Sequence, residues 1–248
     1  MKTVNCPALF ISDQATLCDD AGVMAHTSLA SRVYDKILTR LLGGQMPPGQ
    51  VFNRRQVAAE LEVSVAPILE AMLELEAEGL IETLPRKGTR VRLLSPEDLR
   101  GQLIVREALE CEAARLYRGA PVERHIKRLT RLAAEIDEAA LSSPAHAKQE
   151  VRFHHYLVSL AEVPALTSAF ERIMKIGMLY AVQALHPTPE DAPRSSHVEL
   201  VNALLTHDPA QAEAAIRAHI RMGKEPLMLA AAAASNAQFP TSPSWLDD

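Results

Sequence analysis

The hydrophobic positions in the N-terminal part of the chain repeat first with the period of a helix and later with that of short strands. Apolar residues recur at every fourth position from Leu29 to Leu41, which predicts an amphipathic helix that ends at a glycine pair. Asn53 and Ser64 are suitable N-caps for two further short helices, the second of which ends at Gly79. The following segment predicts two short strands around a turn with the sequence RKG.

The chain from residue 95 to residue 232 has helical periodicity throughout, and no alternation of apolar and polar residues indicates a strand there. The run Ser95–Asp98 combines an N-cap serine, a proline at the first helical position and acids in the first turn. Further prolines mark the boundaries of the later helices. The expected helices span residues 96–118, 121–141, 144–161, 164–185, 195–206 and 209–232. These helices predict an all-helical bundle.

These patterns divide the chain into two domains, as its length of 248 residues also suggests. The first domain spans residues 28–94 and the second spans residues 95–232. Residues 1–27 show no clear period, and we expect a flexible arm. Residues 233–248 are rich in serine and proline, and we expect a flexible tail.

Composition narrows the class of protein. The chain is 48% hydrophobic but only 4% aromatic, which favours packed helices. The net charge of −5 provides no general attraction to nucleic acid, so any contact with DNA requires a local basic patch. Cys6, Cys18 and Cys111 have no metal-binding spacing and indicate free thiols in a reducing compartment. No membrane span or signal peptide is apparent, and we expect a cytoplasmic protein.

Many residues of the first domain match a known sequence pattern, and their spacing fits that pattern without gaps. They are Val33, Tyr34, Ile37, Gly44, Pro48, Gly49, Val57, Ala58, Leu61, Val63, Ser64, Pro67, Glu70, Ala71, Leu75, Glu76, Glu78, Gly79, Leu80, Gly88 and Val91. The domain so arranged resembles the winged helix-turn-helix of the GntR family of bacterial regulators. The helical block looks like the FCD effector-binding domain of the FadR-like branch. The resemblance implies a mainly α protein that is not an enzyme but a ligand-responsive transcriptional regulator, bound to operator DNA as a homodimer.

The third predicted helix departs from the pattern of that family. Family members typically carry arginines there, in an arrangement like S-R-x-P-V-R-E-A-L-R-R-L. The matching positions in this chain are Val65, Leu69, Leu73 and Glu74. Arginine can read a guanine edge with two hydrogen bonds, which these replacements cannot do. Residues 64–79 hold four glutamates and no lysine or arginine, a net charge of −4. We therefore expect atypical or weak DNA recognition, with an apolar patch at Leu69 and Leu73.

Several cations remain that could contact phosphates in the first domain. Two of them open the second helix and the others decorate the turn between the strands. Together with Ser64 at the start of the third helix, the candidate DNA-binding residues are Arg54, Arg55, Arg86, Lys87 and Arg90. Phosphate contacts position a protein on DNA but carry little sequence information. The alternative interpretation is that these cations are ordinary solvated surface charges.

Four residues of the second domain are candidates for a metal site. Glu150 and His154 are four residues apart on one helix face, while His197 and His219 lie on the apolar stripes of two later helices. Neutral imidazoles suit Zn, Ni or Fe, and a carboxylate adds a hard oxygen ligand. A single inward histidine is more often a hydrogen-bonded core residue. The resemblance to FCD domains favours a divalent metal ion, because their ligands follow a D-x-x-F-H pattern with a histidine on each of two later helices. Glutamate replaces the usual aspartate here.

Arg106 matches an arginine that reaches the effector site in similar domains, and its planar guanidinium suits a small organic acid. The alternative for Arg106 is an ion pair on the helix surface with Glu110, four residues on. Two other functions stay open beside the regulator. One is a metalloenzyme whose metal activates water. The other is a degenerate family member that acts as a ligand sensor or through protein contacts, with weak or no specific DNA binding.

Overall fold

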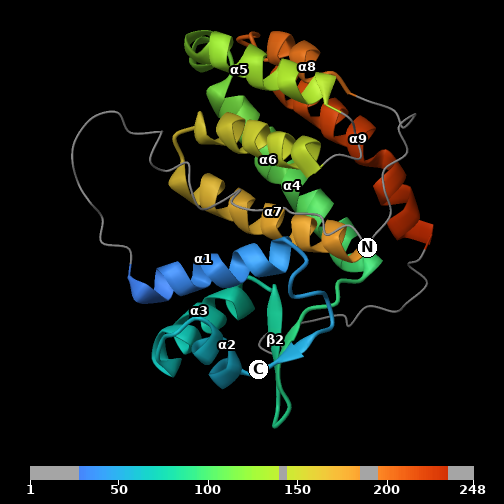
Figure 1. Ribbon diagram of the computed structural model, residues 1–248. Coiled ribbons are helices and arrows are strands. Elements are labelled where there is room, and N and C mark those ends of the chain that lie inside the picture. The colour runs from blue at the N-terminus through green and yellow to red at the C-terminus, as the bar shows by residue number, and fades with distance from the viewer. Residues whose placement is uncertain (1–27, 140–143, 185–194, 234–248) are drawn as a thin grey trace, which may run out of the picture.

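The computed structural model describes residues 28–139, 144–184 and 195–233, and the expected arm at 1–27 and nearly all of the expected tail lie outside these ranges. The described chain has two parts (Figure 1), a small winged domain and a helical bundle. The predicted fold class, a winged helix-turn-helix followed by an all-helical bundle, is confirmed. None of the described helices is both long and apolar enough to cross a lipid bilayer.

The winged domain begins with α1 (Leu29–Leu42), which Ser28 caps by accepting a hydrogen bond from the Ser31 amide. The elements that follow are β1 (Val51–Phe52), α2 (Arg54–Glu60), α3 (Val65–Ala77), β2 (Ile81–Leu84) and β3 (Gly88–Val91). Asn53 caps α2 as predicted, whereas Ser64 occupies the N-cap position of α3 without a side-chain hydrogen bond.

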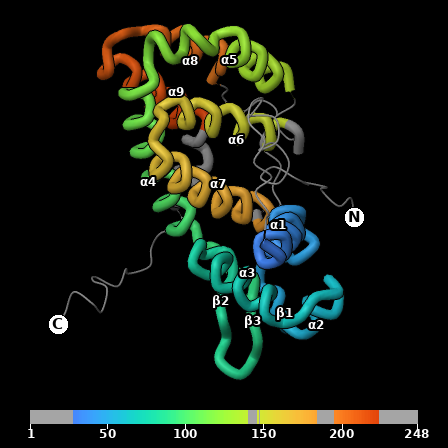
Figure 2. Tube along the Cα trace, turned by 90° about the vertical axis from the view of Figure 1, so that its left-hand side faces the viewer, coloured from blue at the N-terminus to red at the C-terminus, as the bar shows by residue number. Residues whose placement is uncertain are grey.

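The three strands form an antiparallel sheet in the order β1-β3-β2. Thr89 of β3 lies opposite both Phe52 of β1 and Thr83 of β2. Gly88 starts β3 with a φ of +108°, and a side chain there would bring its Cβ within 2.8 Å of the Phe52 carbonyl oxygen. Glycine is therefore required at the start of β3, where its backbone passes close to that of β1. The β2–β3 hairpin projects from the end of the molecule farthest from α5 and α8 (Figures 1 and 2).

Six helices form the described part of the bundle. They are α4 (Pro96–Tyr117), α5 (Ala120–Glu138), α6 (Pro144–Ser159), α7 (Pro164–Ala184), α8 (His197–Ala203) and α9 (Pro209–Ala233). The predicted start of α4 is a full capping box, in which Ser95 accepts from the Asp98 amide and the Asp98 carboxylate accepts from Ser95. The long helix α4 packs against α6, α7 and α9, and its Ala113, Ala114 and Tyr117 are fully buried.

Helix α7 joins the two domains. Its Ile176 and Leu179 are buried in the same hydrophobic cluster as the core of the winged domain. Gln183 accepts a hydrogen bond from the Leu94 amide and donates one to the Leu94 carbonyl. The winged domain therefore packs against α7 of the bundle, and α1 lies beside α7 in Figure 1.

Candidate functional site

Three histidines from three different helices meet inside the bundle. His154 lies on α6, His197 opens α8 and His219 lies on α9, and all three side chains are buried. One ring nitrogen of each lies within 4.8 Å of a ring nitrogen of the other two. The ring centroids of His197 and His219 are 4.5 Å apart, and that of His154 is 5.3 Å from His219. This is a cluster of potential ligands built by the packing of α6, α8 and α9.

Each imidazole is held by a hydrogen-bond partner at its Nδ1 atom. Nδ1 of His154 lies 2.5 Å from a carboxylate oxygen of Glu110 on α4, and Nδ1 of His197 lies 2.8 Å from Asp137 on α5. Nδ1 of His219 lies 2.7 Å from the hydroxyl of Ser195. The same Asp137 carboxylate also accepts from the first backbone amides of α8. These contacts fix the orientation of all three rings.

The charge state of the two carboxylates decides which ring nitrogen carries the proton. Burial alone would raise the pKa of Glu110, but the charges of His154 and Arg106 and their hydrogen bonds lower it to about 2. Burial also acts to raise the pKa of Asp137, and the hydrogen bonds from His197 outweigh it and lower that pKa. Both groups are therefore ionised acceptors near neutral pH. The Nδ1 atoms of His154 and His197 must then donate to them, so in the neutral tautomer of each ring the lone pair is on Nε2.

Those lone pairs have no partner among the residues that the structure describes. The Nε2 atoms of His154 and His197 are buried and form no hydrogen bond within the described part of the chain. Burial, followed by the proximity of His154, lowers the pKa of His197 to about 4. Burial and the other two histidines lower that of His219 to about 2. Buried, unpartnered acceptors are rare in folded proteins because they cost free energy. Neutral imidazoles held by carboxylates at one nitrogen and open at the other suit a divalent transition metal.

Glu150 is not part of this group of three, although it lies one turn before His154 on α6. Its Oε1 atom lies 3.9 Å from the guanidinium of Arg106. Its charge acts to raise the pKa of both His197 and His219, but burial outweighs it and both values stay low. The structure therefore brings the three predicted histidines together and places the predicted carboxylate at the edge of the cluster.

Arg106 pairs with Glu110, with Nε 2.6 Å from the carboxylate, but this pair is not on the surface. Both side chains are almost fully buried, at 4% and 1% exposure. Glu110 thus connects Arg106 to His154 in one buried chain of contacts. The sequence shows Glu110 only as a neighbour of Arg106 and contains no sign that Asp137 and Ser195 hold histidines, because their partners are distant along the chain.

The predicted DNA-binding cations of the winged domain differ in exposure and in ion pairing. Arg55, Arg86 and Lys87 are exposed and Arg54 is half-buried. Arg90 instead pairs with Glu82 on the neighbouring strand, at 2.9 Å. Three of the predicted cations are therefore exposed, Arg54 is half-buried, and Arg90 is partly neutralised.

The third helix exposes apolar side chains, as the sequence predicts for Leu69 and Leu73. Two of the four glutamates in residues 64–79 form hydrogen bonds within the winged domain. Glu76 accepts from the backbone and hydroxyl of Thr83, and Glu78 accepts from Tyr34. The net acidity of this helix consequently overstates the negative charge that α3 presents to a partner.

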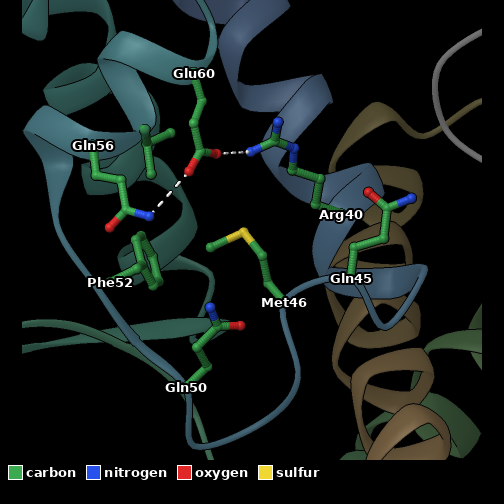
Figure 3. A pocket seen from close by; sticks show the side chains of 8 residues that line it. Arg40, Gln45, Met46, Gln50, Phe52, Gln56 and Glu60 are labelled. Atoms are coloured by element: carbon green, nitrogen blue, oxygen red, sulfur yellow. Dashed lines mark hydrogen bonds and ion pairs between the residues drawn. The ribbon is translucent and has the colours of Figure 1, made fainter.

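A separate hollow of about 300 Å³ lies on the winged domain (Figure 3). It is lined by Arg40, Gln45, Met46, Gln50, Phe52, Gln56, Val57 and Glu60. Glu60 is held there by Arg40 at 2.7 Å and by Gln56 at 3.1 Å (Figure 3). This half-open hollow contains none of the histidines, and its cation is already paired with Glu60, so we do not assign the effector to it.

Two family descriptions match the two domains. Residues 29–91 match "Bacterial regulatory proteins, gntR family", and residues 103–222 match "FCD domain". These ranges cover the winged domain and the part of the bundle that contains the histidine cluster. Arg106 also lies within the second match.

Several known proteins are similar over most of the chain. A protein of Paenarthrobacter nicotinovorans named "Probable D-xylose utilization operon transcriptional repressor" is 32% identical over 199 residues, 79% of this chain and 88% of that protein. The HTH-type transcriptional repressor RspR of Escherichia coli is 22% identical over 70% of this chain and 78% of its own length. The solved structure of E. coli McbR/YncC, at 20% identity, covers 82% of this chain and 98% of that one, with a TM-score of 0.64, and shows the same fold. The chain therefore belongs to the GntR family of transcriptional regulators, with an N-terminal winged helix-turn-helix and a C-terminal FCD domain, and not to a family of enzymes.

Proposed function

We propose that this protein is a dimeric regulator that binds operator DNA and holds a divalent metal ion and a small organic acid in its C-terminal bundle. One observation carries the metal part of this proposal: the buried Nε2 atoms of His154 and His197 lack partners among the described residues, while their Nδ1 atoms are anchored on carboxylates. A metal ion satisfies such nitrogens without adding buried charge to the rings.

His154, His197 and His219 would hold the ion. Glu150 is a further ligand candidate, because it lies beside the cluster and is only half-buried. When bound, the metal supplies a positive centre with coordination positions for water or for a carboxylate. Because these three histidines lie on α6, α8 and α9, a bound ion would link the three helices and stabilise their packing.

Arg106 is the proposed contact for the carboxylate of the effector. Its guanidinium is bonded tightly to Glu110 but only loosely to Glu150, at 2.6 and 3.9 Å respectively. An organic acid competing with Glu150 for Arg106 would approach the histidine cluster at the same time. An arginine fork favours a carboxylate over a neutral ligand.

DNA binding rests on the winged domain, whose exposed cations Arg55, Arg86 and Lys87 can neutralise phosphates. Operators of two-fold symmetry require two such domains, which is the reason for proposing a homodimer. The Paenarthrobacter relative is named as a repressor of an operon. We extend the repressor role to this chain as part of the proposal.

Elemental analysis of the purified full-length protein tests the metal centre. The wild type should contain a divalent metal that His154→Ala loses. His155→Ala is the matched control, because His155 is the next residue, is half-buried and pairs with Glu171 at 2.7 Å instead. Equal metal content in wild type and His154→Ala would contradict the site.

A second candidate function is a family member that senses a ligand without specific DNA binding. The exposed acids Glu70 and Glu74 on α3 favour it. Titration of the protein with duplex DNA over a range of salt concentrations separates the two. A regulator should prefer certain sequences, whereas the alternative predicts no preference at any salt concentration.

A further inference from the structure

Helix α3 presents a stripe of apolar side chains to solvent. Val65 is 44% exposed, Leu69 is 38% exposed and Leu73 is 57% exposed. Their spacing of four residues places them within an arc of about 80° on one side of the helix. Ile68, Met72 and Leu75, roughly 60 to 120° round the helix from Leu69, are buried in the domain core. Exposed apolar side chains gathered in one stripe indicate a surface that another molecule covers.

The stripe adjoins the wing. Glu76 follows Leu69 by two helical turns and therefore lies on the same side of α3. Its carboxylate accepts hydrogen bonds from Thr83 of β2, at 2.7 and 2.9 Å, so this side of the helix faces the strand that leads to the wing. The exposed acids Glu70 and Glu74 lie roughly 100 to 140° further round the helix from Leu69. These two exposed acids therefore lie beside the stripe and not within it.

Exposed and half-buried cations elsewhere in the winged domain favour DNA as the molecule that covers the stripe. Arg86 and Lys87 form the tip of the wing, and Arg54 and Arg55 begin α2. None of these four cations has an ion pair among the described residues. An apolar strip on a domain whose wing tip and α2 carry free cations complements a groove with apolar groups on its floor and phosphates along its rims. A purely apolar protein partner would not need these cations.

The floor of the DNA major groove offers one apolar group, the C5-methyl of thymine. Valine and leucine side chains cannot form hydrogen bonds with base edges, so they can discriminate bases only through that methyl group. Residues near the N-terminus of a recognition helix contact bases, whereas later residues move away from the groove. We propose that Val65 and Leu69 read thymine methyl groups, so that the operator is chosen by the placement of thymines and not by guanine contacts.

This inference rests on the proposed function, since it requires that the winged domain binds DNA. The test begins with selection of bound sites from a random duplex library by the full-length, metal-loaded protein. Each thymine of the selected site is then replaced in turn by deoxyuridine, which removes only the methyl group. Affinity should fall about fourfold at each contacted thymine, as expected for one buried methyl-sized group, and should not change at the others.

The variant Leu69→Ala should bind thymine and deoxyuridine equally at one of these positions, and Val65→Ala should do so at another. Leu116→Ala is the matched control, because Leu116 is 45% exposed on α4 of the bundle. It should keep the full preference for thymine.

These experiments distinguish a failure of the proposed DNA binding from a failure of the proposed methyl recognition. If no sequence is enriched and no salt-dependent binding occurs, the proposed DNA-binding function is wrong. The proposed recognition of thymine methyl groups is then wrong as well. If sites are selected but deoxyuridine binds as well as thymine at every position, DNA binding stands and methyl recognition is wrong. The same conclusion follows if Leu69→Ala and Val65→Ala retain the wild-type pattern, and the stripe would then belong to a protein contact.

Discussion

Nζ of Lys175 on α7 lies 2.6 Å from Oε1 of Glu78 at the end of α3, so a buried ion pair connects the bundle to the winged domain. Nζ also donates to the hydroxyl of Tyr34 on α1, at 2.7 Å, and that hydroxyl in turn donates to Glu78. Burial, together with Glu78, raises the pKa of Tyr34 far above its ordinary range, so the phenol stays protonated. Three elements are therefore held at one polar point between the domains.

Replacement of Lys175 should weaken the attachment of the winged domain. Lys175→Met leaves the Glu78 carboxylate without its cation in a mostly buried position, and we expect a loss of about 2 kcal/mol in the free energy of unfolding. The double variant with Glu78→Gln should recover part of that loss, because the uncompensated charge is gone. Urea denaturation measures both. Lys127→Met, at an exposed position on α5, is the control and should change little. Equal stability of wild type and Lys175→Met would contradict the importance of this contact.

The carboxylates that hold the histidines should control metal affinity even though they are not proposed as ligands. Glu110→Gln and Asp137→Asn remove the anionic acceptors at Nδ1 of His154 and His197. We expect each to lower metal affinity by roughly 10- to 100-fold, as is usual for such outer partners. Competition with a chromophoric chelator measures the change. Glu171→Gln, which affects His155 instead, should bind metal like the wild type. The same affinity in all three variants would mean that the carboxylates do not act on the cluster.

As the pH falls, the metal-free protein should begin to lose stability at a higher pH than protonation of its carboxylates alone would cause. The pKa of His197 is lowered from 6.5 to about 4 in the folded state, so the unfolded chain binds more protons below pH 6.5. Stability is therefore complete above that pH and is lost as the pH falls toward 4. His219 acts in the same direction. We expect a loss of about 2 kcal/mol per histidine between pH 6.5 and about 5.

Urea denaturation of the metal-free protein at several pH values measures this slope. The variant His197→Gln has no titrating group at that position and should show a smaller slope over the same range. A flat profile in the wild type between pH 6.5 and about 5 would show that the buried rings are already protonated in the folded state.

Cations of the wing should determine the salt dependence of DNA binding. Each phosphate contact contributes roughly 0.9 to the slope of log affinity against log salt concentration. Arg86→Ala and Lys87→Ala should each reduce the slope by about that amount and weaken binding to all sequences alike. Fluorescence anisotropy at several salt concentrations measures the slope. Lys127→Ala on α5 serves as the control, and a slope unchanged in the wing variants would remove the wing from the DNA interface.

Local sequence patterns were sufficient for the secondary structure and for the inward direction of the histidines. The capping box at Ser95 and the cap at Asn53 form as predicted, because they depend only on residues within one helical turn. The helical period likewise predicts that His154, His197 and His219 are buried on separate helices. Where neighbouring residues decide the outcome, the sequence alone is informative.

Tertiary packing decided which groups surround the histidines. Glu110 is 44 residues from His154 and Asp137 is 60 residues from His197, so no local spacing reveals these contacts. Packing also buried the Arg106–Glu110 pair, whose residue spacing alone equally suits an exposed ion pair. The sequence by itself determined the helices, their apolar faces and the family to which the chain belongs. Only the fold decided where those faces meet, because the distance between helices depends on how all their side chains pack together.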